Sequence, residues 1–245
     1  MTTIVKLGGS IITDKTEYRR FMKHDTEKVV SMLSSLEDDL VLVHGGGSYG
    51  HIKAMEYGIP GPINERSRKG FSLIHCDMLR LNGEVSEILI SNDYRFISLA
   101  PSGFIFGRTR SYSAFRKYFE SGLMPVTFGD VYVKSDTEYG IYSGDTLVYD
   151  LARIFRPDRV IFLSDVDGIF NRNPKLYSDA RLLSRLDEDA TFQLSAIDVT
   201  GGIARKLEIM KKVRKYAKSV YLINGLKPER LRMIDSPDLI GTVIK

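Results

Sequence analysis

The sequence has 245 residues, of which 43% are hydrophobic and 27% charged, and its formal net charge is +4. This composition excludes a disordered chain, and no run of about 18 apolar residues that could span a membrane is present. The single cysteine, Cys76, excludes an intrachain disulfide framework. We therefore expect a cytoplasmic protein with no membrane segment, whose small positive excess favours anionic ligands without requiring nucleic acid.

The start of the chain predicts two strands joined by a helix. Residues 3–7 form a β-branched, apolar run that breaks at a glycine pair, and residues 40–44 form a second apolar run that meets three glycines. Between them, residues 25–36 place apolar side chains at helical spacing. A strand, a helix and a strand in this order indicate a parallel crossover, in which both strands are covered on both faces.

The later elements continue this alternation. Residues 64–91 are expected to form a long amphipathic helix, and the alternating pattern between residues 124 and 142 suggests antiparallel hairpin strands. Helices are expected at 112–121, 146–155 and 203–217, and strands at 96–100, 159–163 and 220–223. The prediction is an α/β fold: a three-layer αβα sandwich with a largely parallel central sheet plus β-hairpin elements, formed by one domain over residues 1–245.

Glycine-rich turns follow three of the predicted strands. They are Gly8-Gly9, Gly45-Gly46-Gly47 and Asp167-Gly168, and a further pair, Gly201-Gly202, opens a helix. A lone pair could mark only a strand-to-loop break, but turns of a parallel sheet gather at its carboxyl edge, where ligands bind. Glycine allows backbone amides to approach phosphate oxygens closely. Neither a GxxxxGK[ST] loop nor a GxGxxG run after a strand is present, so this phosphate site is not a P-loop or a dinucleotide fingerprint.

Three lysines accompany these turns. Lys6 lies inside an apolar strand, where a solvated charge would be unusual, and Lys15 lies just beyond the same turn. Lys206 lies in the first turn of a helix, where the helix dipole disfavours a cation unless an anion is near. A flexible ammonium can neutralise charge on a phosphoryl group, so these positions favour phosphate chemistry.

Five segments resemble the amino-acid kinase family in order and spacing. They are residues 6–10, 44–47, 143–145, 164–168 and 201–206, and together they extend over nearly the whole chain. The family includes acetylglutamate, glutamate, aspartate, carbamate and uridylate kinases. The resemblance therefore implies ATP and phosphoryl transfer more firmly than it implies an acceptor. It also implies an acceptor-binding half, about residues 1–140, and a nucleotide-binding half, about residues 141–245.

The acceptor is indicated by the GGGSYGH run at residues 45–51. This run resembles the isopentenyl phosphate kinases, in which a histidine at the position of His51 contacts the acceptor phosphate. The implied reaction converts isopentenyl phosphate and ATP into isopentenyl diphosphate and ADP. Fosfomycin kinases resemble the same branch, so a small phosphonate or carboxylate acceptor stays open. Without the motif, His51 could simply pack at a helix start.

The resemblance also assigns roles to single residues. Lys15, Lys206 and His51 would act in transfer, and Asp145 would orient the lysines or cap a helix. The ATP site would comprise Lys6, Gly8, Gly9, Ser10, Gly47, Asp165, Asp167, Gly202 and Lys206. The acceptor phosphate would meet Gly46, Gly47, Gly50, His51 and Gly129. Asp165 and Asp167, with the loop through Asn171, Asn173 and Lys175, would face the nucleoside or its Mg²⁺, although Asp165 could equally cap a turn.

An isoprenoid tail requires an apolar slot beyond the phosphate. Candidates on the long helix and the hairpin are Phe71, Ile74, Met78, Val131 and Ile141, for which core packing is the alternative. A carboxylate acceptor could instead meet Arg66 or Arg68. The family resemblance also implies a homodimer. A nucleotide sensor or storage module is a further alternative, but such a module needs none of the charges that would stabilise a transition state.

Overall fold

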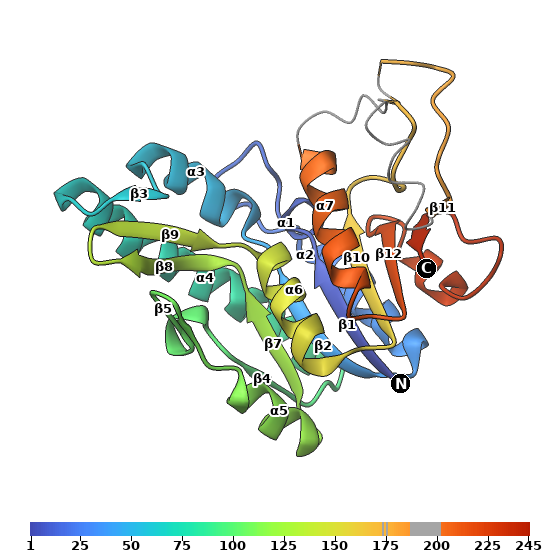
Figure 1. Cartoon of the computed structure of the whole chain (residues 1–245), viewed down its shortest axis with the longest axis horizontal. Helices are drawn as coiled ribbons and strands as arrows, with labels where there is room; N and C mark the ends of the chain where they lie inside the picture. The colour runs from blue at the N-terminus through green and yellow to red at the C-terminus, as the bar shows by residue number, and fades with distance from the viewer. Residues whose placement is uncertain (173, 175, 187–201) are drawn as a thin grey trace.

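The computed structural model describes residues 1–172, 174, 176–186 and 202–245. Its centre is an eight-stranded sheet in the order β11-β13-β12-β10-β1-β2-β7-β4 (Figure 1). Neighbouring strands are parallel except β12 and β13. The strands are β1 (Thr2–Leu7), β2 (Asp39–His44), β4 (Phe96–Ser98), β7 (Met124–Phe128), β10 (Arg159–Ser164), β11 (Arg185–Leu186), β12 (Ser219–Asn224) and β13 (Thr242–Ile244). The α/β sandwich with a largely parallel sheet is therefore confirmed.

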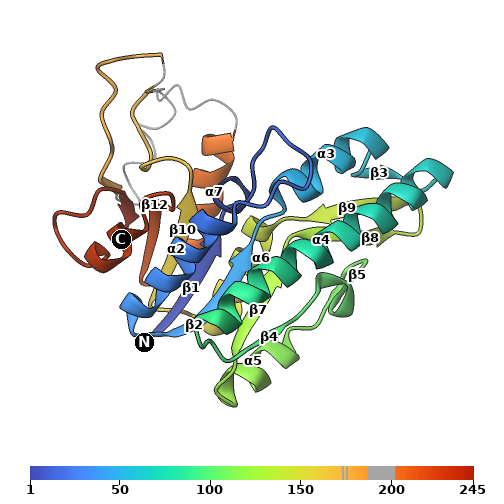
Figure 2. The same cartoon turned by 180° about the vertical axis from the view of Figure 1, so that it is seen from behind.

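Helices cover both faces of this sheet. Figure 2 shows α2 and α4 on one face, and Figure 1 shows α6 and α7 on the other. The helices are α1 (Gly9–Ile12), α2 (Lys23–Leu33), α3 (Gly47–Tyr57), α4 (Glu65–Ser91), α5 (Ser113–Glu120), α6 (Gly144–Phe155) and α7 (Gly202–Arg214), with 3-10 turns at Ser34–Leu36, Pro101–Gly103 and Pro228–Met233. None of the helices in the described part of the chain combines the length and apolarity required to cross a lipid bilayer.

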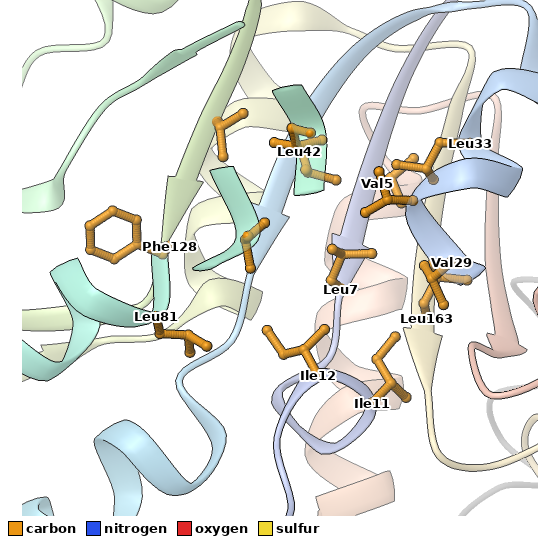
Figure 3. Packing of buried hydrophobic residues seen from close by; sticks show 14 of the residues in the cluster. Val5, Leu7, Ile11, Ile12, Val29, Leu33, Leu42, Leu81, Phe128 and Leu163 are labelled. Carbon is orange, nitrogen blue, oxygen red and sulfur yellow. The ribbon is translucent and has the colours of Figure 1, made fainter. Parts of the chain in front are cut away.

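The alternation of side chains along β1 explains the two layers of the core. Val5 and Leu7 face α1, α2 and α4, whereas Ile4 belongs to the cluster beneath α6 and α7. Figure 3 shows Leu7 among Ile11 and Ile12 of the first helix and Leu163 of β10. Because successive strand residues point to opposite faces, Lys6 lies on the α6 side. The strand that supplies the core thereby also delivers one cation to the start of α6.

The hairpin prediction for residues 124–142 is half wrong. Only β8 (Asp130–Ser135) and β9 (Glu138–Tyr142) form an antiparallel hairpin, which continues into β3 (Gly61–Pro62). β7 instead lies between β2 and β4 as a parallel strand, because all five of its side chains are buried. A second small hairpin joins β5 (Ile105–Phe106) and β6 (Thr109–Arg110). The hairpin β8–β9 extends beyond the sheet beside α3 and α4 (Figure 1).

A buried ion pair lies at the opposite edge of the sheet, where the parallel strands begin. Arg159 at the start of β10 bonds Asp38 at 2.6 Å, and their side chains are only 6% and 1% exposed. Asp38 also accepts a hydrogen bond from Thr3 Oγ1, at 2.5 Å. Removing one partner of such a pair leaves the other charge buried without compensation. Each of the two charges therefore depends on the other for compensation, at the edge that lies away from the glycine turns.

Replacing Asp38 with Ala is expected to lower the free energy of unfolding by about 3 kcal/mol, because Arg159 would be left buried beside only the exposed Asp235. The matched control is Asp39→Ala at the exposed neighbouring position, for which a change within about 0.5 kcal/mol is expected. Urea denaturation of the three proteins measures both values. Equal stabilities of the Asp38 and Asp39 variants would contradict a stabilising role for the pair.

Candidate functional site

The turns after β1, β2 and β10 meet at the carboxyl edge of the sheet. The strand register pairs Leu7 with both His44 and Leu163, so the three strands end level with one another. Gly8 N donates to Leu163 O, and Gly45 N donates to Leu7 O, each at 2.9 Å. A Cβ on Gly8 would lie 2.6 Å from Leu163 O, closer than any real Cβ contact. Glycine is therefore required where β1 passes β10.

The first and second glycine turns touch directly. A Cβ built on Gly9 would lie 2.4 Å from Gly47 N, and Gly47 has a φ of +47°, which favours glycine. Thr13 closes the same junction, since its Oγ1 donates to Gly9 O at 2.7 Å and accepts from Ser48 N at 3.0 Å. The two turns thus form the floor of one pocket.

A cavity of about 680 Å³ opens above these turns. It gathers predicted site residues from β1, α1, α3, α4, α6, α7 and the hairpin, and from the segments that follow α1 and β10. Those that line it are Lys6, Gly8, Gly9, Ser10, Lys15, Gly46, Gly47, Gly50, His51, Ile74, Met78, Gly129, Val131, Ile141, Asp145, Asp165 and Lys206. Residues spread over two hundred positions of sequence therefore share one enclosure.

Lys6 and Asp145 form an ion pair inside the cavity. Their charged atoms are 2.6 Å apart, and the Lys6 side chain is 10% exposed. Burial opposes ionisation of Asp145, but Lys6 lowers its pKa below the ordinary 3.8, so the carboxylate stays charged. The alternative role of Asp145 as helix cap is filled by Ser143, whose Oγ accepts from Thr146 N at 3.1 Å. Asp145 is thus free to hold Lys6.

Lys15 and Lys206 approach the cavity from opposite sides of β10. Lys15 Nζ donates to Asp165 Oδ2 at 2.8 Å, and Ser10 Oγ donates to the other carboxylate oxygen, also at 2.8 Å. Burial by itself would raise the pKa of Asp165, but these hydrogen bonds lower that pKa to about 2. Lys206 Nζ donates to Ser164 Oγ at 2.6 Å. Carboxylates therefore hold two of the three lysines, while the hydrogen bond that Lys206 makes within the described residues goes to a neutral hydroxyl.

Burial, together with the charge of Lys6, lowers the pKa of Lys206 to about 8. Its ammonium carries a solvation penalty that a bound anion would relieve. Desolvation, again with the charge of Lys6, also lowers the pKa of His51 below 6.5. The neutral form of the His51 imidazole is therefore favoured, and that form can donate a hydrogen bond from one ring nitrogen. Arg205 adds a further cation to the wall.

Apolar side chains form a further part of the cavity lining, here called the apolar slot. Ile74 and Met78 come from α4, and Val131 and Ile141 come from the two strands of the hairpin. Phe71, which was predicted with them, does not line the cavity; its ring packs on Tyr139 at a centroid distance of 4.6 Å. Phe71 lies one helical turn before Ile74 on α4, and its side chain therefore contacts the hairpin outside the cavity.

Two other predicted groups lie elsewhere. Asp167 does not line the cavity; its carboxylate accepts hydrogen bonds from Asn224 and Arg230, each at 2.8 Å, and ties the segment after β10 to the end of β12 and to the 3-10 turn Pro228–Met233. Asn171 accepts from Arg181 N within its own loop. Gly202 begins α7, the helix that brings Lys206 to the cavity. Gly201, Asn173 and Lys175 lie outside the described residues.

The sequence did not single out a buried pair beside the apolar slot. Asp130, at the start of β8, accepts a hydrogen bond from His75 Nδ1 of α4 at 2.7 Å, and its side chain is fully buried. Asp130 lines the cavity and also accepts from Val131 N. Burial raises the pKa of Asp130, while the Asp130 hydrogen bond raises that of His75. The position of Asp130 directly after Gly129 was the only local signal in the sequence for this pair.

Comparison with known proteins identifies the family. The family model described as "Amino acid kinase family" matches residues 1–224. The chain belongs to the amino acid kinase family. It is 46% identical to the isopentenyl phosphate kinase of Thermoplasma acidophilum over 99% of both chains, and 35% identical to that of Methanothermobacter thermautotrophicus over 98% of both. A crystal structure of the T. acidophilum isopentenyl phosphate kinase product complex superposes with a TM-score of 0.91 and 43% identity over the whole of both chains.

For this amino acid kinase, replacing Lys206 with Met is expected to stabilise the unliganded protein. Its folded pKa of about 8 lies below the ordinary 10.5, so the charged form costs about 3 kcal/mol. That cost is fully present below pH 8 and fades as the pH rises through 8 towards 10.5. Thermal unfolding at pH 7 and pH 10 should show a raised midpoint that shrinks at the higher pH. An unchanged or lowered midpoint at pH 7 would contradict this, with exposed Lys212→Met as control.

Proposed function

We propose that this protein transfers the γ-phosphoryl group of ATP to isopentenyl phosphate, which yields isopentenyl diphosphate and ADP. The observation that carries the proposal is the composition of one cavity, whose lining combines glycine turns, lysines and His51 with the aliphatic side chains of the apolar slot. A phosphate group joined to a short hydrocarbon chain matches this combination. The full-length similarity to proteins named isopentenyl phosphate kinase supports the same substrate.

We infer that the donor phosphates lie over the first turn. Lys6 and the amides of Gly8, Gly9 and Ser10 would bind them, with Gly47 touching the same anion from the second turn. α7 would add Lys206 and the amide end of the helix at Gly202, where the helix dipole favours an anion. Asp165, ionised and bonded to Lys15 and Ser10, would fix the orientation of these groups rather than contact phosphate itself.

We infer that the acceptor phosphate lies at the start of α3. The residues proposed to bind it are Gly46, Gly47, Gly50, His51 and Gly129. The close approach of Gly9 to Gly47 would bring this phosphate next to the γ-phosphate of ATP. The neutral His51 imidazole would donate a hydrogen bond to the acceptor phosphate, since the lysines already supply positive charge.

The step we propose is a direct displacement at phosphorus. An oxygen of isopentenyl phosphate attacks the γ-phosphorus, a new P–O bond forms, and the bond to the β-bridging oxygen breaks as ADP leaves. A phosphate monoester is already a nucleophile near neutral pH, so no protein base has to remove a proton. Lys15 and Lys206 would stabilise negative charge on the three peripheral oxygens during transfer. Asp145 keeps Lys6 in place.

The apolar slot fits a hydrocarbon tail of limited size. Ile74, Met78, Val131 and Ile141 supply branched or flexible aliphatic surface, and transfer of a buried CH₂ group from water is worth about 0.8 kcal/mol. A carboxylate acceptor would leave its charge without a partner there. Arg66, considered for such an acceptor, instead bonds the Glu56 carbonyl, and neither Arg66 nor Arg68 lines the cavity.

The residues fit a magnesium ion that arrives with the nucleotide. Among the described residues, no three His, Cys, Asp or Glu side chains gather in a way that could hold a metal by themselves. Mg²⁺ commonly keeps several waters and binds one or two carboxylates together with substrate phosphates. Asp165 and Asp145 are the two ionised carboxylates of the cavity, and of these we propose Asp165 as the one that faces the ion. When bound, the ion would offset charge on the β- and γ-phosphates.

Several properties stay predictions. A homodimer, a cytoplasmic location, the absence of nucleic-acid partners and the division into an acceptor half and a nucleotide half are inferred from composition and from the family resemblance.

Acceptor selectivity tests the proposed reaction. With ATP, we expect ADP release with isopentenyl phosphate to exceed release with fosfomycin, N-acetylglutamate or UMP by at least about 100-fold in kcat/KM, because those acceptors place polar groups against the aliphatic slot. A coupled ADP assay with the four acceptors in parallel measures this. Preferential turnover of UMP, the amino acid or fosfomycin would contradict the proposal.

Removing the His51 imidazole tests the acceptor site. We expect His51→Ala to lower kcat/KM for isopentenyl phosphate by about 100-fold, the usual cost of one hydrogen-bond donor to a reacting oxyanion. The KM for ATP should stay close to that of the unaltered enzyme, since His51 is placed on the acceptor side. His24→Ala, an exposed histidine on α2, is the matched control. Unimpaired turnover by the His51 variant would remove its proposed role.

A further inference from the structure

The segment that carries Lys15 is a closed loop, residues 13–22, between α1 and α2. Its ends are joined by hydrogen bonds from Asp14 N to Arg20 O and from Met22 N to Ile12 O, each at 2.9 Å, and by a bridge between Thr13 and Phe21. In Figure 2 it is the dark blue loop that projects beside α3. At its base, Lys15 Nζ bonds Asp165. The position of this lysine therefore depends on where the loop is held.

The tip of the loop is attached to a buried carboxylate on α4. Asp77, fully buried, accepts hydrogen bonds from Tyr18 Oη and Arg19 Nε, the latter at 2.7 Å, and Arg19 Nη2 also bonds it. Arg19 adopts a φ of +58°, an unfavourable backbone conformation for a residue with a side chain. Lys53 of α3 lies 4.8 Å from the centroid of the Tyr18 ring. The hydrogen bonds from Tyr18 and Arg19 to Asp77 outweigh the free-energy cost of the Arg19 backbone conformation.

The partners of Asp77 explain why a charge is tolerated inside α4. Within the described part of the chain, the hydrogen bonds to its carboxylate all come from the loop. A buried carboxylate without such partners is strongly unfavourable. Opening of the loop would therefore leave the Asp77 carboxylate without hydrogen-bond donors on an apolar helix face, between Ile74 and Met78. The free-energy cost of that unpaired buried charge favours the closed position of the loop.

The same helical turn forms a wall of the cavity. Ile74 and Met78 line it, and Met78 Sδ would lie 3.0 Å from a Cβ on Gly46. Asp77 is thus fixed to the acceptor side of the site, while Lys15 reaches towards Asp165 on the donor side. We propose that Asp77 is a positioning residue for phosphoryl transfer, which holds Lys15 over the reacting phosphates through Tyr18 and Arg19. This inference rests on the role of Lys15 in the proposed function.

A double-mutant cycle on the full-length protein tests the proposal. We expect Asp77→Asn to lower kcat for isopentenyl phosphate by about 10- to 100-fold, since a catalytic group displaced by about 1 Å can lose that much. In a Lys15→Ala background the same change should cost less than about twofold, because the positioned group is already gone. Equal fold-losses in both backgrounds would overturn the proposal, since Asp77 would then act independently of Lys15.

A merely structural role is separated by a matched control. Asp150 is another buried carboxylate that accepts two tyrosine hydroxyls, from Tyr112 and Tyr142, far from the loop. Any loss from Asp150→Asn should multiply with that from Lys15→Ala. Arg19→Gln provides a second variant for the cycle should Asp77→Asn fail to fold, because the Arg19 side chain is 31% exposed and Tyr18 still bonds Asp77.

Limited trypsin digestion gives a readout that needs no activity. Cleavage at Lys15 and Arg20 should be about tenfold faster in Asp77→Asn and Arg19→Gln than in the unaltered protein, with no change in the Asp150 variant. Unchanged cleavage would overturn the anchoring. Full turnover by Lys15→Ala would remove the role of Lys15, and this inference with it. If Lys15→Ala is impaired but the fold-losses of Asp77→Asn and Lys15→Ala multiply in the double variant, this inference fails while the proposed role of Lys15 stands.

Discussion

The site depends on the direct contact between two glycine turns. Gly9 and Gly47 approach so closely that a Cβ on Gly9 would lie 2.4 Å from Gly47 N, and one on Gly45 would lie 2.7 Å from Gly9 N. No side chain separates the turn after β1 from the turn after β2. Two phosphates bound by their amides must therefore lie next to each other. Thr13 bonds both turns and keeps them at this spacing. The parallel register of β1 and β2 makes the contact possible.

Charge at this junction is balanced only in part. Asp145 pairs with Lys6 and Asp165 pairs with Lys15, whereas Lys206 bonds a serine hydroxyl and has its pKa lowered to about 8. The burial of the Lys206 ammonium costs stability in the unliganded protein, and we propose that a bound polyphosphate offsets that cost. Such a trade of stability for affinity is common at functional sites.

The strands and glycine turns could be predicted because their signals are local. The β1 strand is buried on both faces and therefore appears as an apolar run that ends at glycine. The pattern failed at β7, where an alternating sequence of residues turned out to be a buried parallel strand. The nucleotide-facing role of Asp167 stays a prediction, because a carboxylate in this turn is equally suited to a structural bond, here with Arg230. Asp77 was missed, since its partners lie almost sixty positions away.

In the proposed reaction the donor and acceptor phosphates meet in one chamber, and the phosphoryl group passes directly between them. The stereochemistry at phosphorus tests this claim, because one in-line displacement inverts the configuration. ATP made chiral at the γ-phosphorus with three oxygen isotopes would be turned over with isopentenyl phosphate, and the product analysed by phosphorus NMR. The account predicts inversion. Retention would mean two successive transfers through a phosphorylated residue, and it would contradict the account.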